Sequence, residues 1–186
     1  MPLEITWTRT AIKIPSPVRK TLEARLGRLH RYFPEIRPKM KIGITRAYEG
    51  SVFQAEDGFV KLMLEVRRTR DGRWKLPTYW TMAHELMHLA QFNTKGLPGG
   101  ERACDVYAMT RLPPRLIDES PSYLTVPKGL RGNWEAEHAR IAHEVAVQAI
   151  QQRSEGLRRY ANWWETEFER RVLQSNGKGR SKRMQK

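Results

Sequence analysis

Residues 78–93 read TYWTMAHELMHLAQFN, and this stretch places the motif H-E-x-x-H inside a helical pattern. His84 and His88 are four residues apart, so both imidazoles lie on one face of a helix and can reach a single metal ion. Glu85 lies beside them, where its carboxylate can take a proton from a water molecule bound to the metal. The alternative is a surface helix that carries two unrelated histidines. The motif favours a metal centre.

The helix that carries the motif has recognisable limits in the sequence. Thr78 follows Pro77 and suits an N-cap, whereas Asn93-Thr94-Lys95-Gly96 is a stop signal. We therefore expect a helix from Tyr79 to about Asn93. Its apolar periodicity comes from Met82, Ala83, Leu86, Leu89, Ala90 and Phe92. Such apolar flanks exclude water from the ligands, which leaves the field of the metal less screened.

A catalytic zinc ion takes three protein ligands and leaves one position for water, so the two histidines need a partner. A second helical pattern opens after the turn Leu97-Pro98-Gly99-Gly100, and in it Glu101 and Asp105 share a face. We expect Glu101 to be the third ligand and Asp105 to orient a ligating histidine. Cys104 is an alternative ligand, on a different face. Glu101 also suits a helix start, where the macrodipole favours a carboxylate.

H-E-x-x-H followed by a Glu-x-x-x-Asp helix resembles the gluzincins, a group that includes the thermolysin-like peptidases. The short spacing between His88 and Glu101 is most similar to the minimal, single-domain minigluzincins, and the resemblance covers roughly residues 16–110. It implies a zinc-dependent metallopeptidase in which His84, His88 and Glu101 bind Zn2+. It also implies that Glu85 activates a zinc-bound water as general base and that the aspartate supports a histidine. A long C-terminal extension departs from the minimal pattern and leaves access to the cleft open.

The remaining patterns, with this resemblance, predict a zincin-like α+β fold. Ser16-Pro17 opens an N-terminal helix whose apolar stripe ends before Pro34. Alternating apolar residues and a hairpin signal predict three strands, at residues 40–44, at residues 60–66 and, after Asp71-Gly72, at residues 74–76. We expect them to form a small antiparallel sheet ahead of the metal helix. Its edge either holds an extended peptide substrate through main-chain hydrogen bonds or is scaffold only.

The chain length is consistent with one compact domain and a tail. We expect a single zincin-like domain over residues 1–175 and a basic disordered tail at residues 176–186. Within the domain, residues 113–132 are a proline-rich connector and residues 133–175 a helical extension.

The connector and the extension each offer a candidate donor for the reaction. The connector is either a lid over the cleft, with Tyr123 as a donor to the reacting carbonyl, or a rigid surface connection. The extension is a long amphipathic helix with Asn133 as N-cap and an interruption near residues 154–156. His138 lies near its apolar stripe and is the catalytic candidate for stabilising the oxyanion, unless it is a satisfied core histidine. His143 is rotated away from the stripe.

The 186 residues include one cysteine, Cys104, and carry a formal net charge of +14. A single cysteine excludes an internal disulfide and a cysteine-built zinc ribbon. No apolar run is long enough to cross a bilayer, and the N-terminus lacks a hydrophobic signal segment. We therefore expect a cytoplasmic protein without membrane contact, whose oligomeric state the sequence does not decide.

Basic residues recur along the N-terminal helix and first strand and again in the tail. Those of the helix and strand are Arg19, Lys20, Arg25, Arg28, Arg31, Arg37, Lys39 and Lys41. Such segments bind polyanions, nucleic acid included, without sequence preference. Solubility, or adaptation to a salty or hot cytoplasm, explains the same charge.

Three functions from different classes fit these patterns. The first is a zinc metallopeptidase that acts on peptides or proteins. The second resembles SprT-like peptidases, which act on nucleic-acid-bound proteins, although the third histidine ligand and the cysteine ribbon of those enzymes are absent. The third is a non-enzymatic, basic nucleic-acid-binding module whose zinc is structural.

Overall fold

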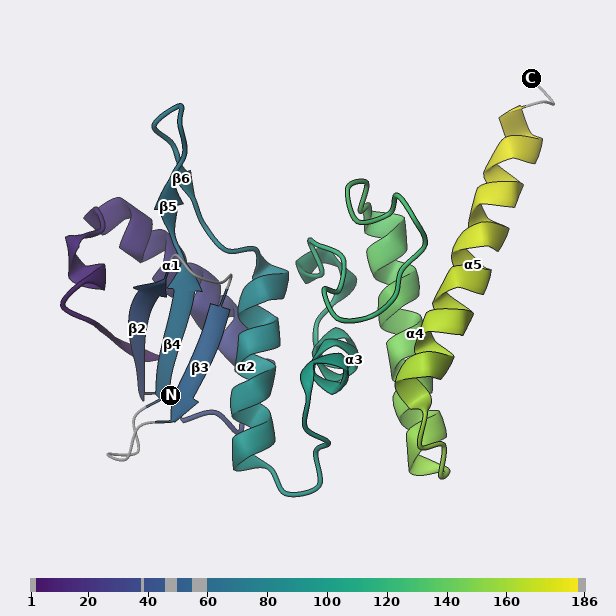
Figure 1. Cartoon of the computed structure of the whole chain (residues 1–186), viewed down its shortest axis with the longest axis horizontal. Helices are drawn as coiled ribbons and strands as arrows, with labels where there is room; N and C mark the ends of the chain where they lie inside the picture. The colour runs from purple at the N-terminus through teal and green to yellow at the C-terminus, as the bar shows by residue number, and fades with distance from the viewer. Residues whose placement is uncertain (1–2, 38, 46–49, 55–59, 184–186) are drawn as a thin grey trace. The chain divides into compact units, whose positions relative to one another are not determined.

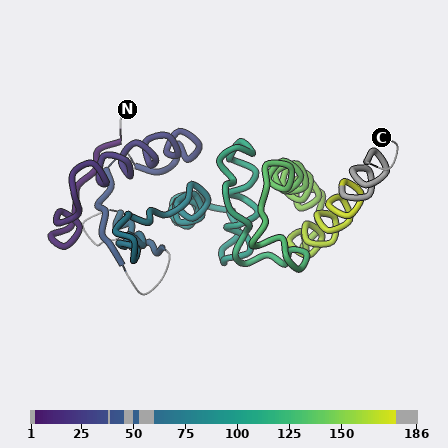
Figure 2. The backbone as a smooth tube through the Cα atoms, turned by 90° about the horizontal axis from the view of Figure 1, so that it is seen from above, coloured from purple at the N-terminus to yellow at the C-terminus, as the bar shows by residue number. Residues whose placement is uncertain are grey.

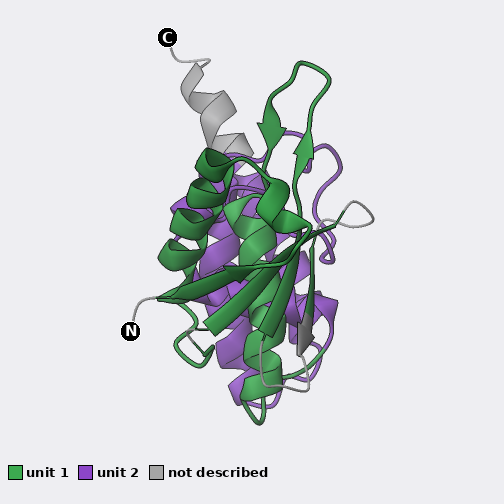
Figure 3. Cartoon of the chain, turned by 90° about the vertical axis from the view of Figure 1, so that its left-hand side faces the viewer, with its two compact units in different colours: residues 1–99 green, residues 100–186 purple. Residues whose placement is uncertain are grey.

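The computed structural model describes residues 3–37, 39–45, 50–54 and 60–183, with the backbone alone for residues 53, 54 and 176–183. The chain forms two compact units, residues 1–99 and residues 100–186 (Figure 3). This division falls inside the single domain that the sequence predicts for residues 1–175. Within the described residues the architecture is α+β, with five α-helices and a small mixed sheet.

The first unit contains a four-stranded sheet, a two-stranded hairpin and two α-helices (Figure 1). Its elements in chain order are β1 (Glu4–Trp7), the 3-10 helix η1 (Ala11–Lys13), α1 (Ser16–His30), β2 (Lys39–Thr45), β3 (Gly50–Gln54), β4 (Val60–Glu65), β5 (Arg67–Arg68), β6 (Trp74–Lys75) and α2 (Tyr79–Asn93). The predicted N-terminal helix, the strands now labelled β2 and β4, and the hairpin are confirmed. At the hairpin turn Gly72 has a φ of 81°, a conformation that glycine adopts without strain.

The four-stranded sheet is mixed, which corrects the predicted antiparallel sheet. Its strand order is β1-β2-β4-β3, with β1, β2 and β4 parallel and β3 antiparallel to β4. The sequence patterns miss β1 and β3. Because β3 carries the chain back along the sheet, β4 returns in the same direction as β2. Helix α1 makes the crossover that the parallel pair β1 and β2 requires.

One face of the sheet belongs to the core of the first unit. Met40 and Ile42 of β2 are in register with Val60 and Leu62 of β4, and all four side chains are buried. Side chains alternate across a strand, so the lysines between them point to the opposite face. The helices complete this core, and the predicted apolar stripe of the N-terminal helix is buried at Leu22, Leu26 and Leu29.

Helix α2 has the bounds that the sequence predicts. The side chain of Thr78 accepts a hydrogen bond of 2.9 Å from the backbone N–H three residues later, which satisfies one of the unpaired donors of the first turn. Arg25 of α1 donates from Nη1 to the carbonyl of Pro77 at 2.7 Å, and its guanidinium lies 5.4 Å from the ring centroid of Tyr79. These contacts fix the start of α2 to α1.

The second unit is helical within the described residues. Its elements are α3 (Glu101–Arg111), the 3-10 helix η2 (Pro114–Leu116), α4 (Ala136–Ser154) and α5 (Tyr160–Arg183). Helices α4 and α5 lie side by side (Figures 1 and 2), and Trp164 joins them. Its indole is buried, its Nε1 donates to the carbonyl of Ala142 at 3.1 Å, and Phe168 stacks on it with ring centroids 4.7 Å apart.

The predicted long helix of the extension consists of two helices, α4 and α5. Helix α4 ends at Ser154, within the interruption that the sequence predicts near residues 154–156. Gly156 has a φ of 106°, and its N–H donates to the carbonyl of Arg153 at 3.0 Å. The N–H of Leu157 donates to the carbonyl of Gln152 at 2.9 Å. This pair of bonds is the Schellman motif, which ends α4 because it satisfies carbonyls that a continuing helix would have used.

The start of α4 also differs from the prediction. Glu135, not Asn133, is the N-cap, and it forms a capping box with His138 in which each side chain accepts the backbone N–H of the other residue. The bond from the Glu135 N–H to Nδ1 of His138 is 3.1 Å. Asn133 lies in the preceding turn and donates from its amide to the carbonyl of Gly129 at 3.0 Å. The three-residue spacing of the pair satisfies two N–H groups at once, which a lone asparagine cannot.

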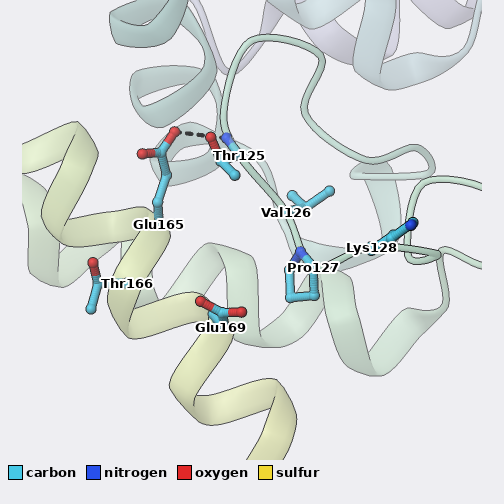
Figure 4. Close-up of a pocket in the computed structure, with 7 residues that line it drawn as sticks. All are labelled: Thr125, Val126, Pro127, Lys128, Glu165, Thr166 and Glu169. Carbon is cyan, nitrogen blue, oxygen red and sulfur yellow. Dashed lines mark hydrogen bonds between the residues drawn. The ribbon is translucent and has the colours of Figure 1, made fainter.

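The connector, residues 113–132, is held against its own unit, which favours the rigid connection over a lid. Leu124 is buried. The N–H of Thr125 donates to Glu165 of α5 at 2.7 Å, beside a pocket of about 340 Å3 (Figure 4). The guanidinium of Arg131 donates to two carbonyls of the connector at 2.8 and 2.9 Å.

Helix α5 continues to Arg183, so residues 176–183 of the predicted disordered tail have helical backbone. Residues 184–186 of that tail lie outside the described residues. Among the helices of the described chain, none combines the length and the apolar character needed to cross a lipid bilayer.

Candidate metal centre

Helix α2 places the residues of the H-E-x-x-H motif in a largely apolar environment. His84 and Glu85 are buried, with 6% and 7% of their surfaces exposed, and His88 is half-buried. The two imidazole rings meet edge to face, with centroids 4.9 Å apart and planes at 82°. The predicted apolar periodicity holds as far as Ala90, whereas Phe92 in the last turn is exposed. A buried glutamate is usually paired, hydrogen-bonded or bound to a metal, because its surroundings must compensate for the loss of water.

Glu85 lies directly against the backbone of β3. A methyl group added to the Cα of Gly50 would lie 2.6 Å from Cγ and 2.7 Å from Oε1 of Glu85. Carbon atoms essentially never approach this closely, so any larger residue at this position forces Glu85 to move. The glycine thus leaves the space that the carboxylate occupies.

The other candidates for the metal centre lie in α3, in the second unit. Glu101 is the first residue of this helix and is exposed, whereas Cys104 and Asp105 are fully buried. Oδ2 of Asp105 accepts the backbone N–H of Tyr123 at 2.8 Å, so this carboxylate anchors the connector. The side chain of Tyr123 is exposed. The roles of Glu101 as a ligand and of Asp105 beside a histidine stay predictions.

Three described residues carry ligand atoms that could hold a metal ion: His84, His88 and Cys104. Imidazole nitrogen and thiolate sulfur are both frequent ligands of zinc. Cys104 forms no disulfide, so its sulfur is in the thiol state that can ligate once deprotonated. Two residues therefore remain candidates for the third ligand, Glu101 from the sequence pattern and Cys104 from its chemistry.

The histidines outside the motif have structural partners. Nδ1 of His138 accepts the N–H that caps α4, so a role for this residue at an oxyanion depends on its Nε2 alone. Nδ1 of His143 lies 2.8 Å from the carbonyl oxygen of Met109. Nε2 of His30 lies 3.0 Å from the carbonyl oxygen of Ile36. The catalytic role of His138 stays a prediction.

Gly50 is the residue of this site that the sequence patterns miss. The signal for its strand is the pair Val52-Phe53, whose residue types favour strands, but a run of five residues is too short to show a clear alternation.

Comparison with known proteins assigns no relative to the chain, since no family model, no curated protein and no solved structure matches it. The function is therefore inferred from the chemistry of the residues themselves.

We predict that His88→Ala abolishes zinc binding, because the imidazole that remains on α2 cannot hold the ion with a single further ligand. Elemental analysis of the full chain after dialysis should find about one zinc ion in the wild type and almost none in the variant. His30→Ala removes a histidine of the same unit outside the motif and should keep the wild-type zinc content. Loss of zinc from both variants, or from neither, would contradict a centre built on the motif.

Proposed function

We propose that this chain is a zinc-dependent metallopeptidase in which His84 and His88 bind the metal and Glu85 is the general base. The observation that supports this most directly is the burial of Glu85 on the helix that carries both imidazoles, with its carboxylate held against the backbone at Gly50. A carboxylate that is fixed next to metal ligands and shielded from bulk water is well placed for proton transfer.

The residues on α2 suit a zinc ion. Bound zinc supplies Lewis-acid chemistry, since it polarises a carbonyl and lowers the pKa of water to about 7. Neutral ring nitrogens of His84 and His88 would hold it, so binding requires both histidines to be deprotonated. We propose Glu101 as the third ligand on the sequence pattern, because two histidines and one glutamate are a known catalytic ligand set. Cys104 is the alternative.

Glu85 would carry the proton through the reaction. Its carboxylate accepts a proton from the attacking water and then gives that proton to the nitrogen of the leaving amine. One group thereby serves first as base and then as acid. Gly50 leaves room for this carboxylate beside the main chain of β3, and a stable position of the carboxylate would serve both transfers.

We propose an extended peptide as the substrate. Strand β3 lies at the edge of the four-stranded sheet and begins at Gly50, the residue in contact with Glu85. A peptide that pairs with a strand edge gains main-chain hydrogen bonds whatever its side chains are. A peptide that pairs along β3 would have its scissile bond near Glu85. Because pairing requires an extended main chain, we expect short or unfolded peptides to be better substrates than folded proteins.

Glu85→Gln tests the proposed mechanism. The amide keeps the size of the side chain but cannot accept the proton of the water, so hydrolysis of a fluorogenic peptide should slow by at least about 100-fold. Zinc content should stay at the wild-type level, because Glu85 is not a ligand. Hydrolysis at the wild-type rate by this variant would rule out Glu85 as the base.

Glu101→Gln and Cys104→Ser separate the two candidates for the third ligand. If Glu101 ligates, its amide variant should bind zinc at least about tenfold more weakly, while Cys104→Ser binds as the wild type does. The reverse result would assign the ligand to Cys104. Competition against a chromophoric zinc chelator measures both affinities. Wild-type affinity in both variants would exclude a ligand from α3.

Gly50→Ala should slow hydrolysis while it leaves zinc bound. The added methyl group forces the carboxylate of Glu85 to move, and a displacement of about 1 Å at a reacting group costs about 100-fold in rate. The rate is measured with the fluorogenic peptide and the zinc content by elemental analysis.

Gly43→Ala in β2 is the matched control for Gly50→Ala. Its methyl group would meet the flexible side chain of Met63 rather than Glu85, so it should lower stability and keep the rate of the folded protein. Adding Gly50→Ala to Glu85→Gln should cause no further loss, because both act on one carboxylate. A further loss of the same size in the double variant would show that Gly50 acts by another route.

A further inference from the structure

The β5–β6 hairpin concentrates positive charge on one projecting part of the first unit (Figure 1). Residues 67–75 contain five exposed cations and a single carboxylate, that of Asp71; the cations are Arg67, Arg68, Arg70, Arg73 and Lys75. We propose that this hairpin and the groove beside it form a binding site for single-stranded nucleic acid.

The groove at the hairpin has a volume of about 470 Å3 and combines three kinds of side chain. Ile14 and Val66 are buried and supply apolar surface, while Lys13 and Arg68 supply positive charge. Trp74 lines the groove and keeps 37% of its surface exposed. Sites for single strands combine cations that contact the phosphates with aromatic rings on which bases stack. The groove offers both within one small volume.

Much of the positive charge on the hairpin is free to meet phosphate groups. Two ion pairs neutralise part of it, Arg73 with Asp71 at 2.5 Å and Arg67 with Glu65 at 3.2 Å. Arg68 donates from Nε to the carbonyl of Gly72 at 3.0 Å, which leaves its charge unbalanced. Among the described side chains, no carboxylate forms an ion pair with Lys13, Arg70 or Lys75.

The three arginines of α1 contact aromatic side chains of the first unit. The guanidinium groups of Arg25 and Arg28 lie 5.4 and 5.7 Å from the ring centroid of Tyr79. That of Arg19 lies 5.8 Å from the ring of Trp7. Phosphate contact with these three arginines would compete with their cation–π contacts, whereas the hairpin cations without ion pairs meet no such competition.

The groove fits a single strand better than a duplex or an acidic peptide. The faces of the bases are covered in a duplex, so only an unpaired base can stack on Trp74. An acidic peptide would satisfy the cations but carries no regular series of flat rings for the indole. The formal net charge of +14 adds long-range attraction for any polyanion.

The test is the fluorescence anisotropy of a labelled oligothymidine of about 20 nucleotides titrated with the full chain. Trp74→Leu keeps apolar bulk but removes the stacking face, so it should weaken binding about tenfold, and Trp74→Phe should restore most of the affinity. Arg68→Ala/Arg70→Ala should also weaken binding and reduce the slope of log affinity against log salt concentration by about 1.4.

Arg158→Ala/Arg159→Ala is the matched control, since it removes the same charge from two exposed arginines of the second unit. It should bind nearly as the wild type does. Equal weakening by the two double variants would show that only the net charge of the protein matters, and this would overturn the proposal. Wild-type affinity in Trp74→Leu would also overturn it. Displacement of the oligonucleotide by an equal concentration of polyglutamate would overturn it in favour of an acidic peptide. Glu85→Gln should bind normally, so this result is independent of the peptidase activity.

Discussion

The burial of Glu85 against the backbone of β3 is the contact on which the candidate site depends. Moving a carboxylate out of water costs several kcal/mol even after the protein relaxes, so a buried one persists only where its surroundings compensate. Here the carboxylate occupies space that exists only because position 50 has no side chain. The same strand is at the edge of the sheet, so one element both lies against the proposed base and has a main-chain edge with which the proposed substrate could pair.

Elements whose signals are local could be predicted from the sequence. Helix α2 begins after Thr78 and ends at Asn93 as expected, because a side-chain cap and a stop signal act within one turn. Strand β4 alternates between buried and half-buried residues over its whole length, which a six-residue run shows clearly. The closeness of His84 and His88 follows from their spacing of four residues on a helix, whereas the edge-to-face angle of their rings depends on side-chain rotamers.

Features that depend on distant partners could not be predicted in this way. The parallel pairing of β2 and β4 requires knowledge of β3, a strand of five residues without a clear pattern. Gly50 gains its importance only when the fold brings it to Glu85. Glu135 is the N-cap of α4 because its reciprocal hydrogen bonds with His138 outweigh the higher intrinsic preference of asparagine for the N-cap position.

Two residues with predicted roles in the site also make structural contacts, and the two uses need not exclude each other. Asp105 illustrates this: its Oδ2 accepts the N–H of Tyr123, yet a carboxylate has two oxygens and can accept several hydrogen bonds. The bond to Tyr123 occupies Oδ2, so Oδ1 could still accept a hydrogen bond from a histidine, as the predicted role requires. His138 is the opposite case. A neutral imidazole has one acceptor nitrogen. In His138 this acceptor is Nδ1, which accepts the N–H that caps α4, so the ring proton must be on Nε2. That bond holds His138 in the tautomer that donates from Nε2, the form that a role at an oxyanion needs.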